Sequence, residues 1–495
     1  MTSLPFRFGS PEQFAACRRL LEDASYNEDA LRAHYGLDAL SSVARRAPAT
    51  SIEDRLELLT QLFVYGLHAT RGQIESLLPP GSLEALAALG LLVPSTHNQE
   101  LWAGTVMLYP RRGHYFVSDR SRNIDGSPIE RMGDIVFSAL TDDTERFLDL
   151  LPAEPCESLL DLGTGAGVAA LVGAGSARHV WAVDITDRAA RFAEFNRRLN
   201  AVPNVTVLQG DLYAPVHDLQ FDRIVIHPPF VPALHQTLIY QDAGLDGQDI
   251  TRRAVSQLAR HLNPGGRFYC LTVGVDAEDA PFEQTVRGWL GPDATPFDVA
   301  FLPRQIISLS FLARSVALKS GLGSVGALRL EDTFKSLRIR EFVYGAIVIQ
   351  RHRSSRAGFT VRRQRSTVGE AALPWLLHWE TELASRGSEW LLDTRPVAPP
   401  TVEFVVTHRM VDGELSPIGY RMQTDHPLST EARAAPWMGA LIARCDGRAS
   451  AREHFASLKE AGAFPEQIGP ADFARVLGQL VSGGFLWIPG FEPKL

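Results

Sequence analysis

The sequence predicts an α/β protein with a central parallel sheet and a smaller, mainly helical domain at each end. Between residues 159 and 226, apolar segments of strand length alternate with glycine turns and a helical segment. Residues 1–120 and the C-terminal part from Trp437 have apolar residues at helical spacing instead. A chain of 495 residues is long enough for about three domains. We therefore expect domains at 1–120, 121–370 and 371–495.

The first domain is predicted to contain helices followed by a β-ribbon. The helices are expected at Pro11–Asp23, Ile52–Tyr65, Thr70–Leu78 and Leu83–Leu92. Ser82 is the expected N-cap of the last helix. Leu101–Val117 alternates around Pro110-Arg-Arg-Gly113, as a hairpin would. This order indicates a winged-helix-like module, which either packs on the core or docks the substrate.

The first strand of the core ends in a glycine-rich turn. Leu159, Leu160 and Leu162 predict a buried strand, and Asp161-Leu-Gly163-Thr-Gly165-Ala-Gly167 continues from it. The glycines allow a tight turn and a close approach of a ligand to the backbone. The helix predicted at 168–172 points its amino end at that ligand. Dinucleotide oxidoreductases use a similar turn, so this motif alone leaves both classes open.

Two further strands end near carboxylates. Val180–Asp184 places a carboxylate where it can accept hydrogen bonds from two ribose hydroxyls. Val205–Leu208 is followed by Gly210-Asp211, where a carboxylate can bond an exocyclic adenine amine. Both features still fit a dinucleotide.

The fourth strand, Phe221–Ile226, leads directly into His227-Pro228-Pro229-Phe230. The two prolines fix their own φ and keep the preceding residues out of the helical region. Carbonyl groups and an aromatic face are therefore held rigidly at the carboxyl end of a parallel strand. A dehydrogenase has no use for this element, so it favours a different nucleoside-binding enzyme.

With these motifs, residues 130–350 resemble the class I S-adenosylmethionine-dependent methyltransferases. More narrowly, they resemble the HemK/PrmC-like N-methyltransferases, whose fourth strand ends in Asn-Pro-Pro followed by Tyr or Phe. Thr141-Asp-Asp-Thr144, Ala243-Gly244-Leu-Asp246-Gly247 and Leu262-Asn-Pro-Gly-Gly266 are similar to three further segments of that family. The resemblance implies a Rossmann-like, seven-stranded core, with its last strands near Phe297–Leu302 and Phe342–Gln350.

The resemblance also implies a cofactor, S-adenosyl-L-methionine, and a set of site residues. The expected cofactor-binding residues are Asp161, Gly163, Thr164, Gly165, Gly167, Asp184, Ile185, Asp211 and Leu212, with Asp143 and Thr144 from the segment before the first strand. The expected catalytic residues are His227, Pro228 and Phe230.

His227 stands where the family usually has Asn. The Asn oxygen and the next proline carbonyl accept hydrogen bonds from a planar NH2 group, and the aromatic ring stacks on that group. A neutral imidazole accepts only one such bond, although it can also take a proton. N-methylation remains the favoured reaction, but His227 weakens the assignment of a glutamine acceptor.

Three functions follow from these residues. The first is N-methylation of an amine or amide nitrogen in an RNA base or a protein side chain. The second is methylation of a small amine or amide in natural-product biosynthesis, which His227 favours. The third is a noncatalytic binding scaffold, against which the intact glycines, Asp161, Asp184 and Asp211 argue.

Composition and charge limit the partners and the cellular location that we expect for this protein. The net charge of −8 argues against a protein that binds nucleic acid nonspecifically over much of its surface, and no DNA partner is predicted. No apolar run approaches the roughly 20 residues that cross a bilayer, and the amino terminus lacks a signal pattern, so we expect a cytoplasmic protein without a membrane partner. The four cysteines are scattered, which predicts neither a metal site nor a disulfide framework.

Residues 301–365 carry an excess of positive charge. They hold 13 Lys or Arg against three acidic residues. This segment is either a solvated surface or a site for RNA phosphates or an acidic partner.

The C-terminal domain is predicted to combine a hairpin with helices. After a linker at Thr394–Pro400, Val402–Met422 is expected to form a hairpin that turns at Asp412-Gly413. Helices are expected at Trp437–Cys445, Ala451–Leu458 and Ala471–Val481, in a second winged-helix-like module.

Overall fold

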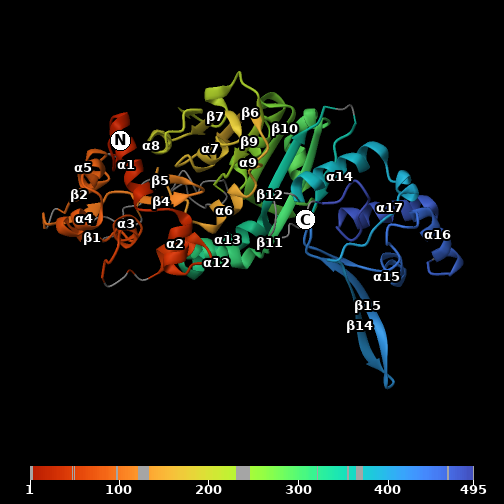
Figure 1. The fold of residues 1–495 in the computed structure, drawn as a ribbon. Coiled ribbons are helices and arrows are strands. Elements are labelled where there is room, and N and C mark those ends of the chain that lie inside the picture. The colour runs from red at the N-terminus through yellow and green to blue at the C-terminus, as the bar shows by residue number, and fades with distance from the viewer. Residues whose placement is uncertain are drawn as a thin grey trace. The chain divides into compact units, whose positions relative to one another are not determined.

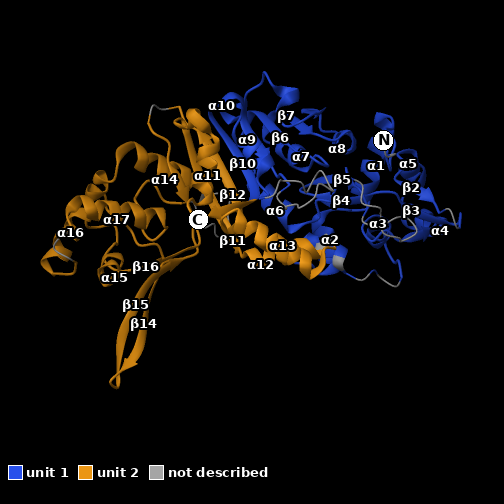
Figure 2. Cartoon of the chain, turned by 180° about the vertical axis from the view of Figure 1, so that it is seen from behind, with its two compact units in different colours: residues 1–272 blue, residues 273–495 orange. Residues whose placement is uncertain are grey.

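The computed structural model describes residues 4–46, 48, 51–95, 98–120, 133–229, 246–319, 321–353, 356–363, 372–464 and 468–493. The chain forms two compact units, residues 1–272 and 273–495 (Figure 2). The boundary falls inside strand β10 (Leu262–Ala277). The division into three domains at 120 and 370 therefore stays a prediction.

The amino-terminal part of unit 1 is helical, with two small sheets (Figure 1). Its helices are α1 (Pro11–Asp23), α2 (Glu28–Tyr35), α3 (Arg55–Phe63), α4 (Arg71–Leu77) and α5 (Ser82–Ala88). Strands β1 (His68–Thr70), β3 (Leu101–Gly104) and β2 (Leu92–Pro94) form one sheet in that order, and β4 (Met107–Arg111) pairs with β5 (His114–Ser118) in the other. Four of the five helices and the ribbon were predicted.

One detail of the prediction was wrong: Ser82 does not cap α5. Gly81, in the left-handed region at φ 85°, is the N-cap, and Ser82 is the first helical residue. The hydroxyl of Ser82 donates to the carbonyl of Pro79 at 2.6 Å, because the side chain turns back into the preceding turn. Helix α2 was missed; its eight residues contribute only Leu31 to the core, too few to show a helical period.

The central sheet has the strand order β13-β11-β12-β10-β9-β6-β7-β8. In unit 1, β6 (Cys156–Leu162), β7 (Ala177–Asp184), β8 (Val205–Gln209), β9 (Phe221–Ile226) and the first part of β10 run parallel to their neighbours. In unit 2, β11 (Phe297–Ile307) and β12 (Ile339–Arg351) are antiparallel. The expected α/β fold is confirmed. Seven strands were expected, and the eighth is the three-residue β13 (Thr360–Arg362) at the edge.

The parallel strands are apolar because helices cover the sheet and leave little of it in water. Leu159, Leu160 and Leu162 of β6 are fully buried, as are Phe221 and Val225 of β9. Helices α6 (Asp142–Leu148), α7 (Val168–Gly173), α8 (Asp187–Leu199), α9 (Asp249–Val255) and α10 (Leu258–His261) belong to this part of unit 1. The family-like segment from Leu262 to Gly266 is already part of β10, where the register shifts before Arg267.

In unit 2, α11 (Phe282–Trp289) follows β10, and α12 (Leu309–Lys319) and α13 (Gly323–Ser336) lie between β11 and β12 in the chain. The C-terminal elements are α14 (Ala372–Arg386), β14 (Glu403–Val411), β15 (Glu414–Thr424), β16 (Thr430–Arg433), α15 (Pro436–Ile442), α16 (Ala451–Glu460) and α17 (Pro470–Ser482). The predicted hairpin is confirmed as β14-β15. It turns at Asp412-Gly413, both with positive φ.

Within the described ranges, no helix combines the length and the apolar character that crossing a bilayer needs.

Candidate functional site

The glycine turn leaves its backbone open to a ligand. Gly163, Gly165 and Gly167 have φ of 68°, 55° and 83°, which favour glycine. A Cβ atom added at Gly163 or Gly165 would meet nothing within 4 Å, so the space above these residues is open. At Gly167 it would lie 3.1 Å from the Cβ of Ala193. The first two glycines thus expose the turn, and the third allows it to pack closely on α8.

Asp161 stabilises the turn through hydrogen bonds. Its side chain is buried, and Oδ2 accepts hydrogen bonds from the hydroxyl of Thr164 at 2.6 Å and from the amide of Ala170 at 3.1 Å. Burial raises the pKa of this carboxyl to about 7. Asp161 and Thr164 therefore tie the turn to α7.

Asp184 ends β7 beside the same turn. Its Oδ2 accepts from the amide of Gly165 at 2.9 Å, and its Oδ1 from the amide of Thr186 at 3.0 Å. Oδ1 also accepts from the hydroxyl of Thr186 at 3.2 Å, whereas Oδ2 retains capacity for a second hydrogen bond. Burial raises the pKa of the Asp184 carboxyl above its ordinary value. The neighbouring Ile185 side chain is 51% exposed, although it is large and apolar.

Asp211 and Leu212 follow β8. Leu212 is buried, with φ of 47°. The exposed Asp211 carboxylate forms an ion pair with Arg253 of α9. The carboxylate expected to face an adenine amine therefore also contacts Arg253. No sequence motif had indicated Arg253.

The register of the sheet brings these positions to one edge. Leu162 of β6 pairs with Val183 of β7 on one side and with Ile226 of β9 on the other. Asp184 pairs with Gln209 of β8. The turn after β6, the loops after β7 and β8, and the His227 corner therefore all begin at the carboxyl edge of the parallel strands, where open α/β sheets bind ligands.

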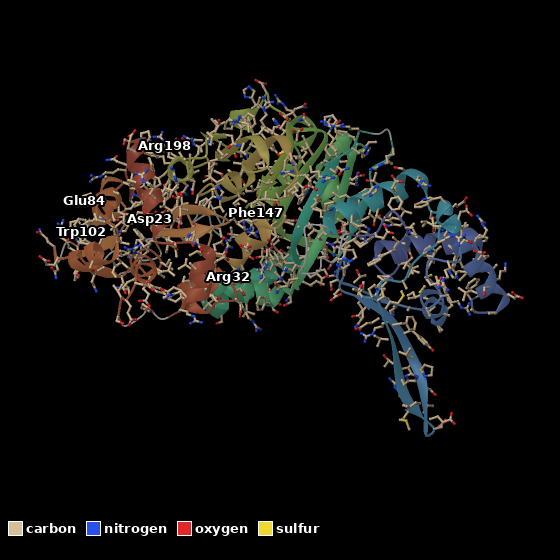
Figure 3. The ribbon with its side chains drawn as sticks, in the orientation of Figure 1. Asp23, Arg32, Glu84, Trp102, Phe147 and Arg198 are labelled. Atoms are coloured by element: carbon tan, nitrogen blue, oxygen red, sulfur yellow. The ribbon has the colours of Figure 1, made fainter. Side chains whose placement is uncertain are left out.

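His227 lies against α6. Its ring centroid is 5.1 Å from that of Phe147, a buried residue of α6 (Figure 3), with an angle of 31° between the rings. Burial lowers the pKa of the imidazole to about 4, although the charge of Asp143 acts in the opposite direction. The imidazole is therefore neutral at pH 7. Pro228 is buried, whereas Phe230 and the Ala243-Gly244 part of the family segment lie outside the described residues.

Helix α6 carries the remaining predicted residues. Thr141 is its N-cap and accepts from the amide of Thr144 at 3.2 Å. Asp143 accepts a hydrogen bond from Arg146 at 2.8 Å. Both predicted residues, Asp143 and Thr144, thus lie in the first turn of the helix that contacts His227.

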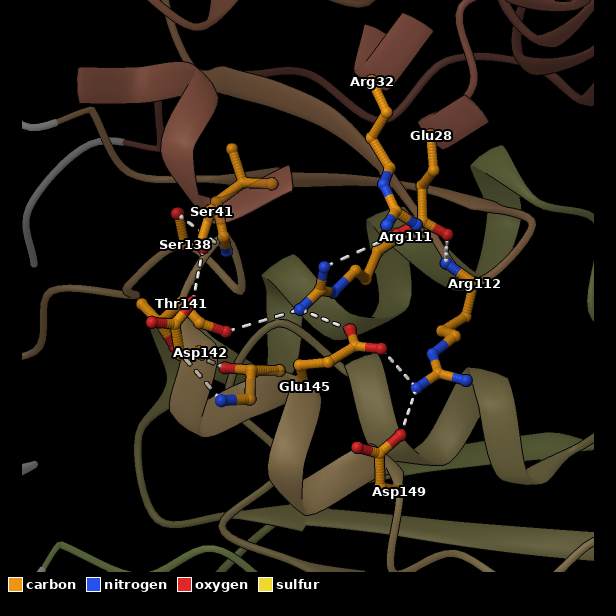
Figure 4. Close-up of polar contacts among 12 residues, drawn as sticks. Glu28, Arg32, Ser41, Arg111, Arg112, Ser138, Thr141, Asp142, Glu145 and Asp149 are labelled. Atoms are coloured by element: carbon orange, nitrogen blue, oxygen red, sulfur yellow. Dashed lines mark hydrogen bonds and ion pairs between the residues drawn. The ribbon is translucent and has the colours of Figure 1, made fainter. Parts of the chain in front are cut away.

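An arginine pair joins α6 to the amino-terminal part of unit 1 (Figure 4). Arg111 of β4, which is buried, contacts Glu145 of α6 at 2.6 Å and Glu28 of α2 at 3.5 Å. Arg112 bridges Glu145 and Asp149. These ionic contacts join α6 to β4 and α2, and no sequence motif pointed to them.

A buried amide joins the same amino-terminal part to the glycine turn. Asn196 of α8 donates from Nδ2 to the carbonyls of Ala166 at 2.8 Å and Val117 at 3.0 Å, and its Oδ1 accepts from the amide of Val117 at 2.8 Å. Asn196 is completely buried. Asn196, which no sequence motif indicated, therefore joins hairpin β4-β5 to the turn.

Six of the 13 Lys and Arg residues of the 301–365 segment form ion pairs with acidic residues in the described part of the chain. Ion pairs join Arg356 to Asp298, Arg362 to Asp276 and Glu283, Arg363 to Glu380, and Arg338 to Glu278 and Asp279. Much of the positive charge counted in the sequence is thus neutralised within unit 2. An RNA partner for this segment stays a prediction without structural support.

Residues 134–277 match the family described as the methyltransferase small domain. This segment is a class I S-adenosylmethionine-dependent methyltransferase domain of the HemK-like branch. The chain is 34% identical over 157 residues to a release factor glutamine methyltransferase of Gloeobacter violaceus (27% of this chain, 55% of that protein), and 35% identical over 146 residues to one of Moorella thermoacetica (26% and 50%). It is 31% identical over 160 residues to a ribosomal protein uL3 glutamine methyltransferase of Bradyrhizobium diazoefficiens (30% and 50%). The chain spans about half the length of these curated relatives.

S-adenosyl-L-methionine is the cofactor of this class of domain, and the residues present fit it. The open backbone at Gly163 and Gly165 leaves room for a ligand beside the turn. The Asp184 carboxylate suits a ribose diol, and the exposed Ile185 side chain suits the face of an adenine ring.

Proposed function

We propose that this protein is an S-adenosylmethionine-dependent N-methyltransferase whose acceptor is a planar side-chain amide of a protein, with glutamine as the first candidate. One observation carries the proposal. The His227-Pro228-Pro229 corner ends β9, the strand that pairs with β6, so the corner and the glycine turn begin at adjacent positions on one edge of the sheet. The names of the relatives, which act on glutamine in release factors or in ribosomal protein uL3, support an amide acceptor.

The proposed binding roles follow from the contacts already described. The turn at Gly163–Gly167 and Asp184 would hold the nucleoside and amino-acid parts of the cofactor, with Ile185 and Leu212 against the adenine. The bound cofactor supplies an electrophilic methyl group on a sulfonium. Asp161, Thr144 and Asp143 would act by holding the turn and α6 in place.

At the corner, the protein would orient the acceptor rather than move protons. With a pKa of about 4, the imidazole of His227 is neutral at pH 7 and can accept one hydrogen bond from an NH2 group. The carbonyl of Pro228 is a second acceptor at a fixed position. Two such bonds would set the nitrogen lone pair in line with the methyl carbon, and alignment of this kind is the main source of rate enhancement in a displacement that needs little acid or base. Phe230 would stack on the planar group.

The test is methyl transfer from labelled cofactor to purified release factor, ribosomal protein uL3, total RNA and a small-metabolite fraction. We expect label in protein that survives nuclease and is located on glutamine by mass spectrometry. Label confined to RNA would move the acceptor to a base, and label confined to small molecules would favour the biosynthetic alternative. Either result would contradict the protein acceptor.

Variants of His227 test the corner itself. His227→Ala should lower kcat by about 100-fold, because an aligning hydrogen bond is lost, while the cofactor Kd stays unchanged. His227→Asn, which restores the usual family residue, should retain most of the activity. Unchanged turnover in His227→Ala would remove His227 from the site.

A further inference from the structure

The β14-β15 hairpin of unit 2 extends away from the helices of its own unit (Figures 1 and 2). In the described part of unit 2, the hairpin is anchored at its base. The ring of Phe404 lies so close to Gly439 of α15 that a Cβ on that glycine would meet it at 2.8 Å, and Met422 is buried. Strand β16 pairs with β15 only between Arg421 and Thr424. The rest of the hairpin is a two-stranded ribbon.

The free part of this ribbon carries apolar side chains in water. Every residue from Val406 to Val411 is exposed. Met410 and Leu415, which are cross-strand partners on one face, are 62% and 67% exposed. Val406 and Met410 continue on β14 the same face that Phe404 presents to α15, because side chains two apart point the same way. Exposed apolar ribbons with unpaired edges are templates for pairing with another strand.

Among the residues that the structure describes, no strand pairs with the outer edge of β14. In the three-stranded sheet β14-β15-β16, β14 is an edge strand, and its nine residues pair only with β15. The backbone groups that point outward are therefore open to a further strand.

We propose that a second copy of this chain pairs with β14, antiparallel and centred on Val406, to form a continuous sheet across two hairpins. Charge selects this register. With the two Val406 residues opposite each other, Glu403 of each copy lies opposite Arg409 of the other, so a two-fold pairing forms two ion pairs. In the described part of the chain, no ion pair involves Arg409, and Glu403 contacts Gln423 at 2.6 Å.

The register is also consistent with the two faces of the strand. Residues directly opposite in an antiparallel pair share a face. Phe404 lies opposite His408 in this pairing, and Val406 opposite its own copy, so the exposed apolar rows of the two hairpins become one row. The interaction is an isologous β-sheet extension, in which backbone hydrogen bonds provide affinity and charge provides register.

Disulfide trapping tests the register in the full-length chain. In Val406→Cys, the two introduced cysteines would be directly opposite, with Cα atoms about 4.5–5.5 Å apart, within disulfide reach. In Met410→Cys, the two cysteines would be eight residues apart along the sheet, roughly 27 Å at 3.4 Å per residue. Mild oxidation should give at least tenfold more covalent dimer from Val406→Cys than from Met410→Cys or the unmodified chain, whose four cysteines are the background. Equal yields from the two variants would overturn the proposal.

Reversing the charges of Arg409 and Glu403 tests whether the partner is a second copy of the chain. Sedimentation velocity over about 1–200 μM should show a reversible monomer–dimer equilibrium. Arg409→Glu should raise the dimer Kd at least tenfold, and Glu403→Arg combined with Arg409→Glu should restore it to within about threefold. Arg433→Glu, an exposed arginine of β16, is the matched control and should leave the Kd unchanged. A monomer at every concentration, or a dimer with the same Kd in Arg409→Glu, would refute pairing along β14.

Discussion

Replacing Asn196 with alanine should loosen the glycine turn and lower the stability of the amino-terminal part of unit 1 at the same time. Asn196 is the side chain that joins Ala166 of the turn to Val117 of β5. Its amide is fully buried, so water cannot take its place without rearrangement. The variant therefore isolates the link between hairpin β4-β5 and the expected cofactor site.

The size of the effect follows from the contacts. Three hydrogen bonds, of 2.8, 2.8 and 3.0 Å, end on backbone groups of Ala166 and Val117. Leaving a buried group without its partner costs about 1 kcal/mol or more. The three together predict a loss of about 3 kcal/mol in the free energy of unfolding. If about 1 kcal/mol of this loss falls on the turn, the cofactor Kd rises roughly fivefold.

Urea unfolding and calorimetric titration of S-adenosyl-L-methionine measure the two quantities separately. The matched control is Asn204→Ala. Asn204 donates to two backbone carbonyls, of Ala174 at 3.0 Å and Ala177 at 2.9 Å, but it is half-buried and does not contact the turn. Asn204→Ala should lower the free energy of unfolding by about 1 kcal/mol and leave the cofactor Kd unchanged. A loss below 1 kcal/mol in Asn196→Ala, or an equal change of Kd in both variants, would refute the reasoning.

Three further outcomes follow from the same geometry. Asp184→Ala should raise the cofactor Kd by about ten- to hundredfold, because charge-assisted hydrogen bonds contribute about 1.5–3 kcal/mol; calorimetry showing no change would exclude the assigned role. The pKa of Asp161 is raised to about 7 from 3.8, so the folded chain holds that proton more tightly and wild-type stability should fall as pH rises from about 4 to 7. Asp161→Asn should therefore be more stable than the wild type at pH 8 and not at pH 4 in urea titrations, and an equal difference at both pH values would contradict this. For His227, whose pKa is lowered to about 4 from 6.5, the unfolded chain takes up the proton first, so stability should fall by up to about 3 kcal/mol as pH drops from 6.5 to 4. His227→Asn should remove that part of the pH dependence, and an unchanged slope would show that the imidazole is not buried as described.

The sequence predicted those elements whose signal lies within a few consecutive residues. Strand β9 was predicted with the same bounds as observed, since its apolar run ends at the prolines. The turn of the β14-β15 hairpin followed from Asp412-Gly413. Helix α14 was missed, although its first half is largely apolar and Trp375, Leu376, Leu377 and Trp379 are buried.

The supporting contacts of the site could not be predicted in the same way. Asn196 and Val117 are 79 residues apart, and the partners of Asn196 are backbone atoms, which any sequence could provide. Arg253 reaches Asp211 from 42 residues away. Such contacts depend on how helices pack against the sheet, and single-sequence periodicity does not determine that packing.

The central claim is that a nucleoside sulfonium binds across the carboxyl ends of β6 and β7, with its methyl group directed at the corner after β9. A crystal structure with S-adenosylhomocysteine, the product left after methyl transfer, tests this most directly. We expect ribose hydroxyls within hydrogen-bonding distance of Asp184 and the ligand sulfur facing His227 and Pro228. A ligand bound elsewhere, or a corner turned away from the sulfur, would contradict it.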